Sequence, residues 1–220
     1  MEETNFVLLW KEHYEKIDQS LVINKQLLKE AITQKAESAL QSLTRFKARG
    51  IIAAIIYLIL LGIVLFYAIS NYSSAANYFI ISMGAIFLIN VKALYDYIKH
   101  LIWTNNIDYS GSITEIQGKL TELQLSILRH SRFMVLQFPF WTTFYLSDKW
   151  FPSSVSWGYI VFQFLLTASF TYLAYWLYKN QTIENANNKL VKTLIESSGG
   201  RSVIRAIKFY KEIENFKQSN

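Results

Sequence analysis

The chain has 220 residues, of which 52% are hydrophobic and 16% aromatic, with eight glycines, two prolines and no cysteine. So few glycines and prolines favour long helices over loop-rich sheets. The absence of cysteine excludes disulfides, thiolate nucleophiles and cysteine metal sites. The formal net charge is +6, and we use its distribution along the chain below to predict topology.

The first fifty residues mix charged and apolar positions and lack an early apolar core, so we expect no cleavable signal peptide. Phe6, Leu9, Trp10 and Tyr14 predict a short amphipathic helix that ends at a break around residues 18–23. We interpret Phe6, Leu9 and Trp10 as a candidate surface for a protein partner. The alternative is that they pack on the protein's own helices.

A longer helix is predicted to begin with Asn24 as its cap and to continue into the first membrane span. Its expected apolar face consists of Leu28, Ile32, Ala39, Leu43 and Phe46.

Residues 51–70 contain no charge, and twenty helical residues at about 1.5 Å each match a hydrocarbon core of about 30 Å. Residues 75–91 and 157–178 form two further uncharged runs. Uncharged runs of this length are typical of membrane spans, so we predict an integral membrane protein.

Residues 92–132 are predicted to form a helical hairpin with its tip at residues 105–111. Ser112 and Glu115 have the spacing of a capping box. An apolar seam then recurs every three or four residues, through Ile113, Ile116, Leu120, Leu123 and Ile127. We expect this seam to pack against the N-terminal helix, because neither apolar stripe is stable in water.

Residues 133–151 contain Pro139 in an apolar run that is short for a membrane span. We predict that this stretch nevertheless crosses as a helix kinked at Pro139, with Thr142, Thr143 or Gln137 satisfying the freed backbone groups.

Four polar residues are expected within the spans, namely Asn90, Gln137, Gln163 and Thr167. We interpret Gln137 as making an interhelical hydrogen bond to Gln163 or Thr167, the alternative being a polar path for a solute.

Residues 179–220 are predicted to hold a polar helix from Asn180 to Glu196, a break at residues 198–200, and a final amphipathic helix from Ser202 to about Lys217. The final helix separates apolar residues such as Val203 and Ala206 from basic ones. Two interpretations stay open: the helix lies on anionic lipid, or it docks on the other helices with its basic face in water.

Basic residues expected at the membrane surface are Arg45, Lys47, Arg49, Arg129, Arg132, Arg201, Arg205, Lys208 and Lys211. His130, between two of these arginines, has the chemistry of a titratable switch. A cationic cluster that meets lipid headgroups is the simpler interpretation.

The basic residues predict the topology. Eight lie in residues 1–50, five in 92–132 and eight in 179–220, against Lys149 alone in the connection 147–156. With four crossings, the positive-inside rule places both termini and the hairpin in the cytoplasm.

The sequence gives little indication of catalysis. His13, His100 and His130 lie on separate segments without metal-ligand spacing, and the chain has no P-loop, GxGxxG or GxSxG motif. We therefore expect no enzymatic activity, no cofactor, no metal and no direct binding of nucleic acid.

Three stretches carry a family resemblance, namely LVINKQLLKEA, SALQSLTRFK and IDYSGSITEIQGKLTELQLSILRHSRFMVLQFPFWTTFYLS. In these the chain resembles an uncharacterised family of four-span membrane proteins of Bacteroidota, carried beside regulators of the extracytoplasmic-function sigma-factor type. The resemblance implies a bacterial inner-membrane regulator, anti-sigma-like in role.

The predicted fold is all-α, an integral membrane four-helix bundle with a cytoplasmic helical platform. Two functions fit it. One is a membrane-anchored adaptor or regulator that binds a cytoplasmic protein and contacts membrane lipid. The other is a small channel or transporter component that acts as a homo-oligomer.

Overall fold

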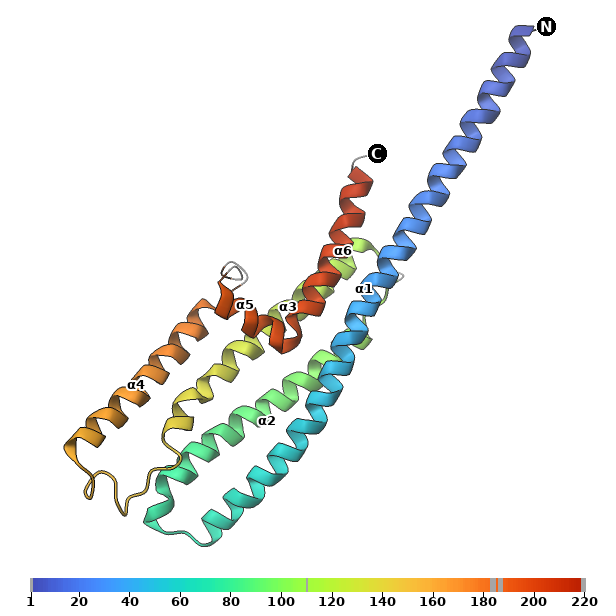
Figure 1. The fold of residues 1–220 in the computed structure, drawn as a ribbon. Helices are drawn as coiled ribbons and strands as arrows, with labels where there is room; N and C mark the ends of the chain where they lie inside the picture. The colour runs from blue at the N-terminus through green and yellow to red at the C-terminus, as the bar shows by residue number, and fades with distance from the viewer. Residues whose placement is uncertain (1, 110, 183–184, 186–187, 219–220) are drawn as a thin grey trace.

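The computed structural model is all-α (Figure 1). It describes the backbone of residues 2–109, 111–182, 185 and 188–218, and the side chains of residues 16, 23, 26–27, 30–109, 111–112, 114–182, 185 and 188–209. Three helices in this described part are long and apolar enough to cross a membrane, within Glu30–Ser70, Ser74–Asn105 and Trp157–Asn180.

Helix α1 runs without interruption from Glu2 to Ser70, which at about 1.5 Å per residue makes it about 100 Å long. The predicted break at residues 18–23 and the cap at Asn24 are therefore wrong. Residues 2–49 contain no glycine and no proline that would end the helix. β-branched residues cost a helix only a few tenths of a kcal/mol each, which is too little to end it.

Helices α2 (Asn77–Asn105) and α3 (Ile113–Met134) form the predicted hairpin. The Ser112 hydroxyl accepts a hydrogen bond from the backbone N–H of Glu115 at 3.2 Å, so the serine caps α3 at the predicted position. The tip therefore returns the chain toward α1 in a few residues.

The segment after α3 differs from the predicted kinked helix. Residues Val135–Thr142 form the 3-10 helix η2, and turns follow it. Pro139 lacks the N–H that would continue an α-helix. The Thr142 hydroxyl donates to the carbonyl of Pro139 at 2.7 Å, and the Thr143 hydroxyl donates to that of Phe140 at 3.3 Å. The threonines thus satisfy carbonyls near the proline, as expected, but in a tighter helix.

The connection after η2 lies at the same end of the molecule as the α1–α2 turn (Figure 1). The Asn77 side chain donates to the Asp148 carboxylate at 2.6 Å, and the rings of Tyr78 and Phe151 lie 5.9 Å apart. The chain therefore runs through α3 and η2 from the hairpin tip to the end of the molecule that contains the α1–α2 turn.

Helix α4 covers Trp157–Asn180, α5 covers Lys189–Ile195, and α6 covers Arg201–Gln218. The predicted continuous helix from Asn180 to Glu196 is wrong, because the side chain of Asn188 caps a new helix by accepting from the N–H of Leu190 at 3.0 Å. The predicted break at residues 198–200 is correct. It is the π turn η4 (Glu196–Gly200), in which Gly199 has a φ of 95°.

The apolar parts of α1, α2, η2 and α4 lie in a row, with α1 and α4 at its two ends (Figure 1). This is an open layer and not a closed four-helix bundle. Large side chains such as Ile59 and Phe66 on α1 and Phe164 on α4 point outward and are exposed. Such surface is stable in lipid and unfavourable in water.

A second core is formed with the part of α1 that precedes residue 47, whereas the apolar run of α1 follows that residue. This platform core consists of Ile32, Ala36, Leu40, Leu43, Ile107, Ile116, Leu120, Leu123, Ile127, Val203 and Ala206. The N-terminal helix and the α3 seam bury their apolar stripes in one core, as expected, but with α6 packed against both of them. Ala36 and Leu40 take the places expected for Ala39 and Phe46. Because Val203 and Ala206 are buried here, the described part of α6 docks on α1 and α3 through its apolar face.

Candidate functional site

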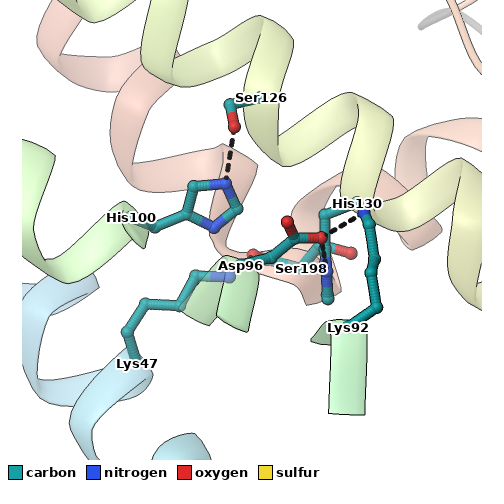
Figure 2. A network of polar contacts seen from close by, with 7 residues as sticks. All are labelled: Lys47, Lys92, Asp96, His100, Ser126, His130 and Ser198. Carbon is teal, nitrogen blue, oxygen red and sulfur yellow. Dashed lines mark hydrogen bonds and ion pairs between the residues drawn. The ribbon is translucent and has the colours of Figure 1, made fainter. Parts of the chain in front are cut away.

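A cluster of polar and charged side chains lies between the apolar run of α1 and the platform core. It brings together α1, α2, α3 and η4 (Figure 2). Its members, which we call the charged cluster, are Lys47, Lys92, Asp96, His100, Ser126, His130 and the backbone carbonyl of Ser198.

The sequence places these residues inside by continuing the buried stripes of the helices. On α2 the buried positions Ile86, Ile89 and Ala93 lead to Asp96 and His100 at steps of three and four. A helix keeps such positions on one face. The α1 stripe likewise passes from Leu43 to Lys47, and the α3 stripe from Ile127 to His130.

Asp96 is the centre of the cluster. Its carboxylate oxygen Oδ2 accepts a hydrogen bond from the Lys92 ammonium and lies 3.0 Å from Nδ1 of His130. Lys92 is partly exposed, whereas Asp96 and His130 are buried. Within the described residues, Asp96 is therefore the buried negative charge on which the neighbouring cations depend.

Lys47 is 0% exposed. Its Nζ donates to the carbonyl of Ser198 at 2.9 Å and lies 4.1 Å from the centre of the Tyr97 ring. A buried ammonium is costly unless it is hydrogen-bonded or paired. The Ser198 carbonyl in η4 and the face of the Tyr97 ring replace part of the hydration that the ammonium group loses on burial.

The two histidines complete the cluster. Nε2 of His100 lies 3.0 Å from the Ser126 hydroxyl, while Nδ1 of His100 is buried without a hydrogen-bond partner. The rings of His100 and His130 lie 5.9 Å apart. Burial holds the pKa of the His130 imidazole below its ordinary value, although its hydrogen bond to Asp96 opposes this.

The predicted membrane-surface residues divide into two groups. Arg45, Arg49, Arg129, Arg201, Arg205 and Lys208 are exposed, and the side chain of Lys211 lies outside the described residues. The prediction is wrong for Lys47, which is buried, and His130 does not meet headgroups because it is only 3% exposed. Arg132 is half-buried and donates through Nε to the carbonyl of Gln181 at 2.5 Å.

The four polar residues predicted within the spans form hydrogen bonds between η2 and its two neighbouring helices. Asn90 of α2 donates to the Gln137 side chain at 3.3 Å, so the predicted partners of Gln137 on α4 are wrong. On the other side, Nε2 of Gln163 donates to the carbonyl of Thr142 at 2.6 Å and lies 3.2 Å from the Thr167 hydroxyl. Each of these side chains fastens η2 to a neighbouring helix.

The predicted partner surface and the expected absence of a metal site are the remaining points. The side chains of Phe6, Leu9 and Trp10 lie outside the described residues. Among the described residues, no group of three or more His, Asp and Glu is placed to hold a metal ion.

The sequence interpretation missed the charged cluster because it assigned Lys47 and His130 separately to the membrane surface. The stripe spacing was the available signal. Comparisons with protein-family models, with curated proteins and with solved structures found no match for this chain.

Proposed function

We propose that the chain is a four-span protein of a bacterial inner membrane that serves as a non-enzymatic adaptor or regulator. In this proposal α1, α2 and α4 each cross the membrane, and η2 with its adjoining residues crosses it as well, which makes four crossings. Its support is that the connection after η2 lies beside the α1–α2 turn. Further support comes from charge, since 21 of the 22 lysines and arginines fall on the opposite side in this topology.

The observation that carries the adaptor function is the platform core. Four separate segments, from α1, the hairpin tip, α3 and α6, bury apolar side chains together outside the apolar membrane runs. A helical body of this kind at a membrane surface offers a rigid site for a soluble protein. The partner is a cytoplasmic protein, and the family resemblance implies that the chain itself has the role of a regulator.

The channel alternative loses support from the intramembrane polar groups. Asn90 and Gln137 bond to one another, and Gln163 bonds to the backbone of η2. Groups that satisfy each other in this way stabilise helix packing and do not present a polar row to a solute. Purified protein in liposomes is accordingly expected to give no solute flux, whereas mild detergent extraction is expected to retain a soluble partner.

The topology is tested by labelling single cysteines, because the chain has none of its own. Ser73→Cys and Ser154→Cys, both at exposed positions, are expected to react with an impermeant maleimide added to intact cells. Asn106→Cys at the exposed hairpin tip is expected to react only after the cells are opened. Labelling of Ser154→Cys only in opened cells would exclude the fourth crossing.

The partner surface is tested at Trp10. Trp10→Ala is expected to abolish co-purification of the partner, because a hot-spot tryptophan contributes about 2 kcal/mol or more to binding. The melting temperature in detergent is expected to change little. Trp103→Ala is the matched control, since Trp103 packs against the platform core and its loss should lower the melting temperature. If the Trp10→Ala protein had a lower melting temperature and still co-purified with the partner, the binding surface would lie elsewhere on the protein.

A further inference from the structure

The charged cluster is one point at which α1 and α2 hold the C-terminal segment. Lys47 of α1 donates to the Ser198 carbonyl in η4, the turn that leads directly into α6 (Figure 2). On the far side of this turn, Val203 and Ala206 of α6 are fully buried against α1 and α3. The contact at Lys47 thus fastens to α1 the turn from which the docked helix starts.

The backbone conformation of η4 at Gly199 allows the turn to pack closely against α1. Gly199 adopts a φ of 95°, a conformation that favours glycine, and a Cβ at this position would lie 2.5 Å from Cδ1 of Leu43. Only a residue without a side chain lets η4 approach α1 so closely. The Ser198 carbonyl is thereby brought to a lysine one helical turn further along α1.

The charge around this attachment is unbalanced. Lys47 faces the cluster from α1, and Lys92, Asp96, Tyr97 and His100 face it from α2. From α3 come Ser126 and His130, and from η4 the Ser198 carbonyl. Burial lowers the pKa of Lys47 to about 7. Below that pH, and with neutral imidazoles, two ammonium groups share one carboxylate. Protonation of His130 would add a third cation next to that carboxylate.

We propose that the charged cluster is a proton-operated latch, in which protonation of His130 releases η4 and α6 from α1 and uncovers the groove between α1 and α3. The added charge repels Lys47, whose hydrogen bond to Ser198 is the attachment that a moving C-terminal segment must break. Asp96 partly offsets this repulsion through its contact with His130, but it is already shared with Lys92.

The direction of the pH response follows from linkage. Burial lowers the pKa of His130 in the latched state, so the released state binds the proton more tightly. For His130, the latch is therefore weakened as the pH falls below the ordinary histidine pKa of about 6.5. Lys47 acts in the same direction at higher pH, because burial lowers its pKa to about 7 in the latched state, so below that pH His130 alone gives the response. At most, one linked proton changes the open population about tenfold per pH unit in this range.

The test uses the full chain in native membranes and two adjacent single cysteines on α6. Ala206→Cys reports release, because Ala206 is 0% exposed, and Arg205→Cys is the exposed control that corrects for the reactivity of the thiol. The ratio of maleimide labelling at the two positions is expected to be low at pH 8. It should rise up to about tenfold between about pH 6.5 and 5.5 and return at pH 8.

Two substitutions test whether the pH response of labelling comes from the charged cluster. His130→Gln keeps a donor for Asp96 but does not titrate, and Lys47→Gln keeps a donor for Ser198 but carries no charge. Both are expected to protect Ala206→Cys at pH 8 and to flatten its acid response. A flat response in the otherwise unaltered chain would overturn the latch. So would a response in the His130→Gln chain as large as in the unaltered one.

Discussion

Asp96→Asn is expected to destabilise the protein by about 3 kcal/mol, because removing one partner from a buried charged group leaves the others uncompensated. The amide can still accept from His130 and Lys92, so the shape of the charged cluster is kept and the negative charge alone is lost. Lys92 can turn toward solvent, but Lys47 is fully buried and cannot. Burial lowers the pKa of Lys47 to about 7, so the melting temperature in detergent at about pH 6.5, where Lys47 carries its charge, measures the effect.

Glu115→Gln is the matched control for this change. Glu115 pairs with Lys119 at 2.8 Å on the exposed face of α3, and exposed pairs contribute little to stability. The same replacement of a carboxylate by an amide should therefore leave the melting temperature almost unchanged. If Asp96→Asn were equally silent, Lys47 would not depend on Asp96, and the electrostatic account of the cluster would be wrong.

Leu120→Ala is expected to destabilise the platform by about 3 kcal/mol, within the range of about 2–5 kcal/mol for buried leucines. Leu120 is 0% exposed and contributes to the core shared by α1, α3 and α6. The truncation removes apolar contacts and leaves a cavity that a well-packed helical core fills only in part. Thermal melting in detergent should show the loss, together with weaker protection of Ala206→Cys at pH 8.

Leu125→Ala, on the same helix, tests whether this loss comes from burial. Leu125 is 42% exposed, so its truncation removes little buried surface and should shift the melting temperature much less. Equal effects of the two substitutions would mean that helix propensity or the membrane, and not the platform core, determines the stability of α3.

The sequence alone determined the features that depend on neighbouring residues. The run Ile51 to Ser70 is uncharged over a membrane thickness, so its helical and apolar character needs no partner to be recognised. Ser112 begins α3 because a hydroxyl three residues before an N–H caps a helix locally. Gly199 and Gly200 likewise end one helix and begin another for a local steric reason.

The seam of α3 was also predictable, because a spacing of three and four fixes which side chains share a face. The same rule extended by one turn would have placed Asp96, His100 and Lys47 inside, as continuations of buried stripes. Charged residues are usually exposed, however, so their chemistry favours the surface where the spacing favours the interior. Whether a charge at such a position is buried depends on what the other helices offer it.

Tertiary structure alone decided the identity of those partners. Lys47 is buried because a carbonyl 151 residues later in the chain meets its ammonium group, and no local pattern contains that pairing. Gln137 bonds to Asn90 and not to α4, because the 3-10 geometry of η2 rotates its side chains relative to an α-helix.

The same distinction separates the two interpretations of α6. Its amphipathic pattern fits a membrane surface and a protein groove equally well, because both bury one apolar stripe. The docking of Val203 and Ala206 depends on the shape of the groove between α1 and α3. That groove exists only after the hairpin has folded back on α1, so the sequence of α6 by itself determined its two faces, and the packing of distant helices decided what covers the apolar one.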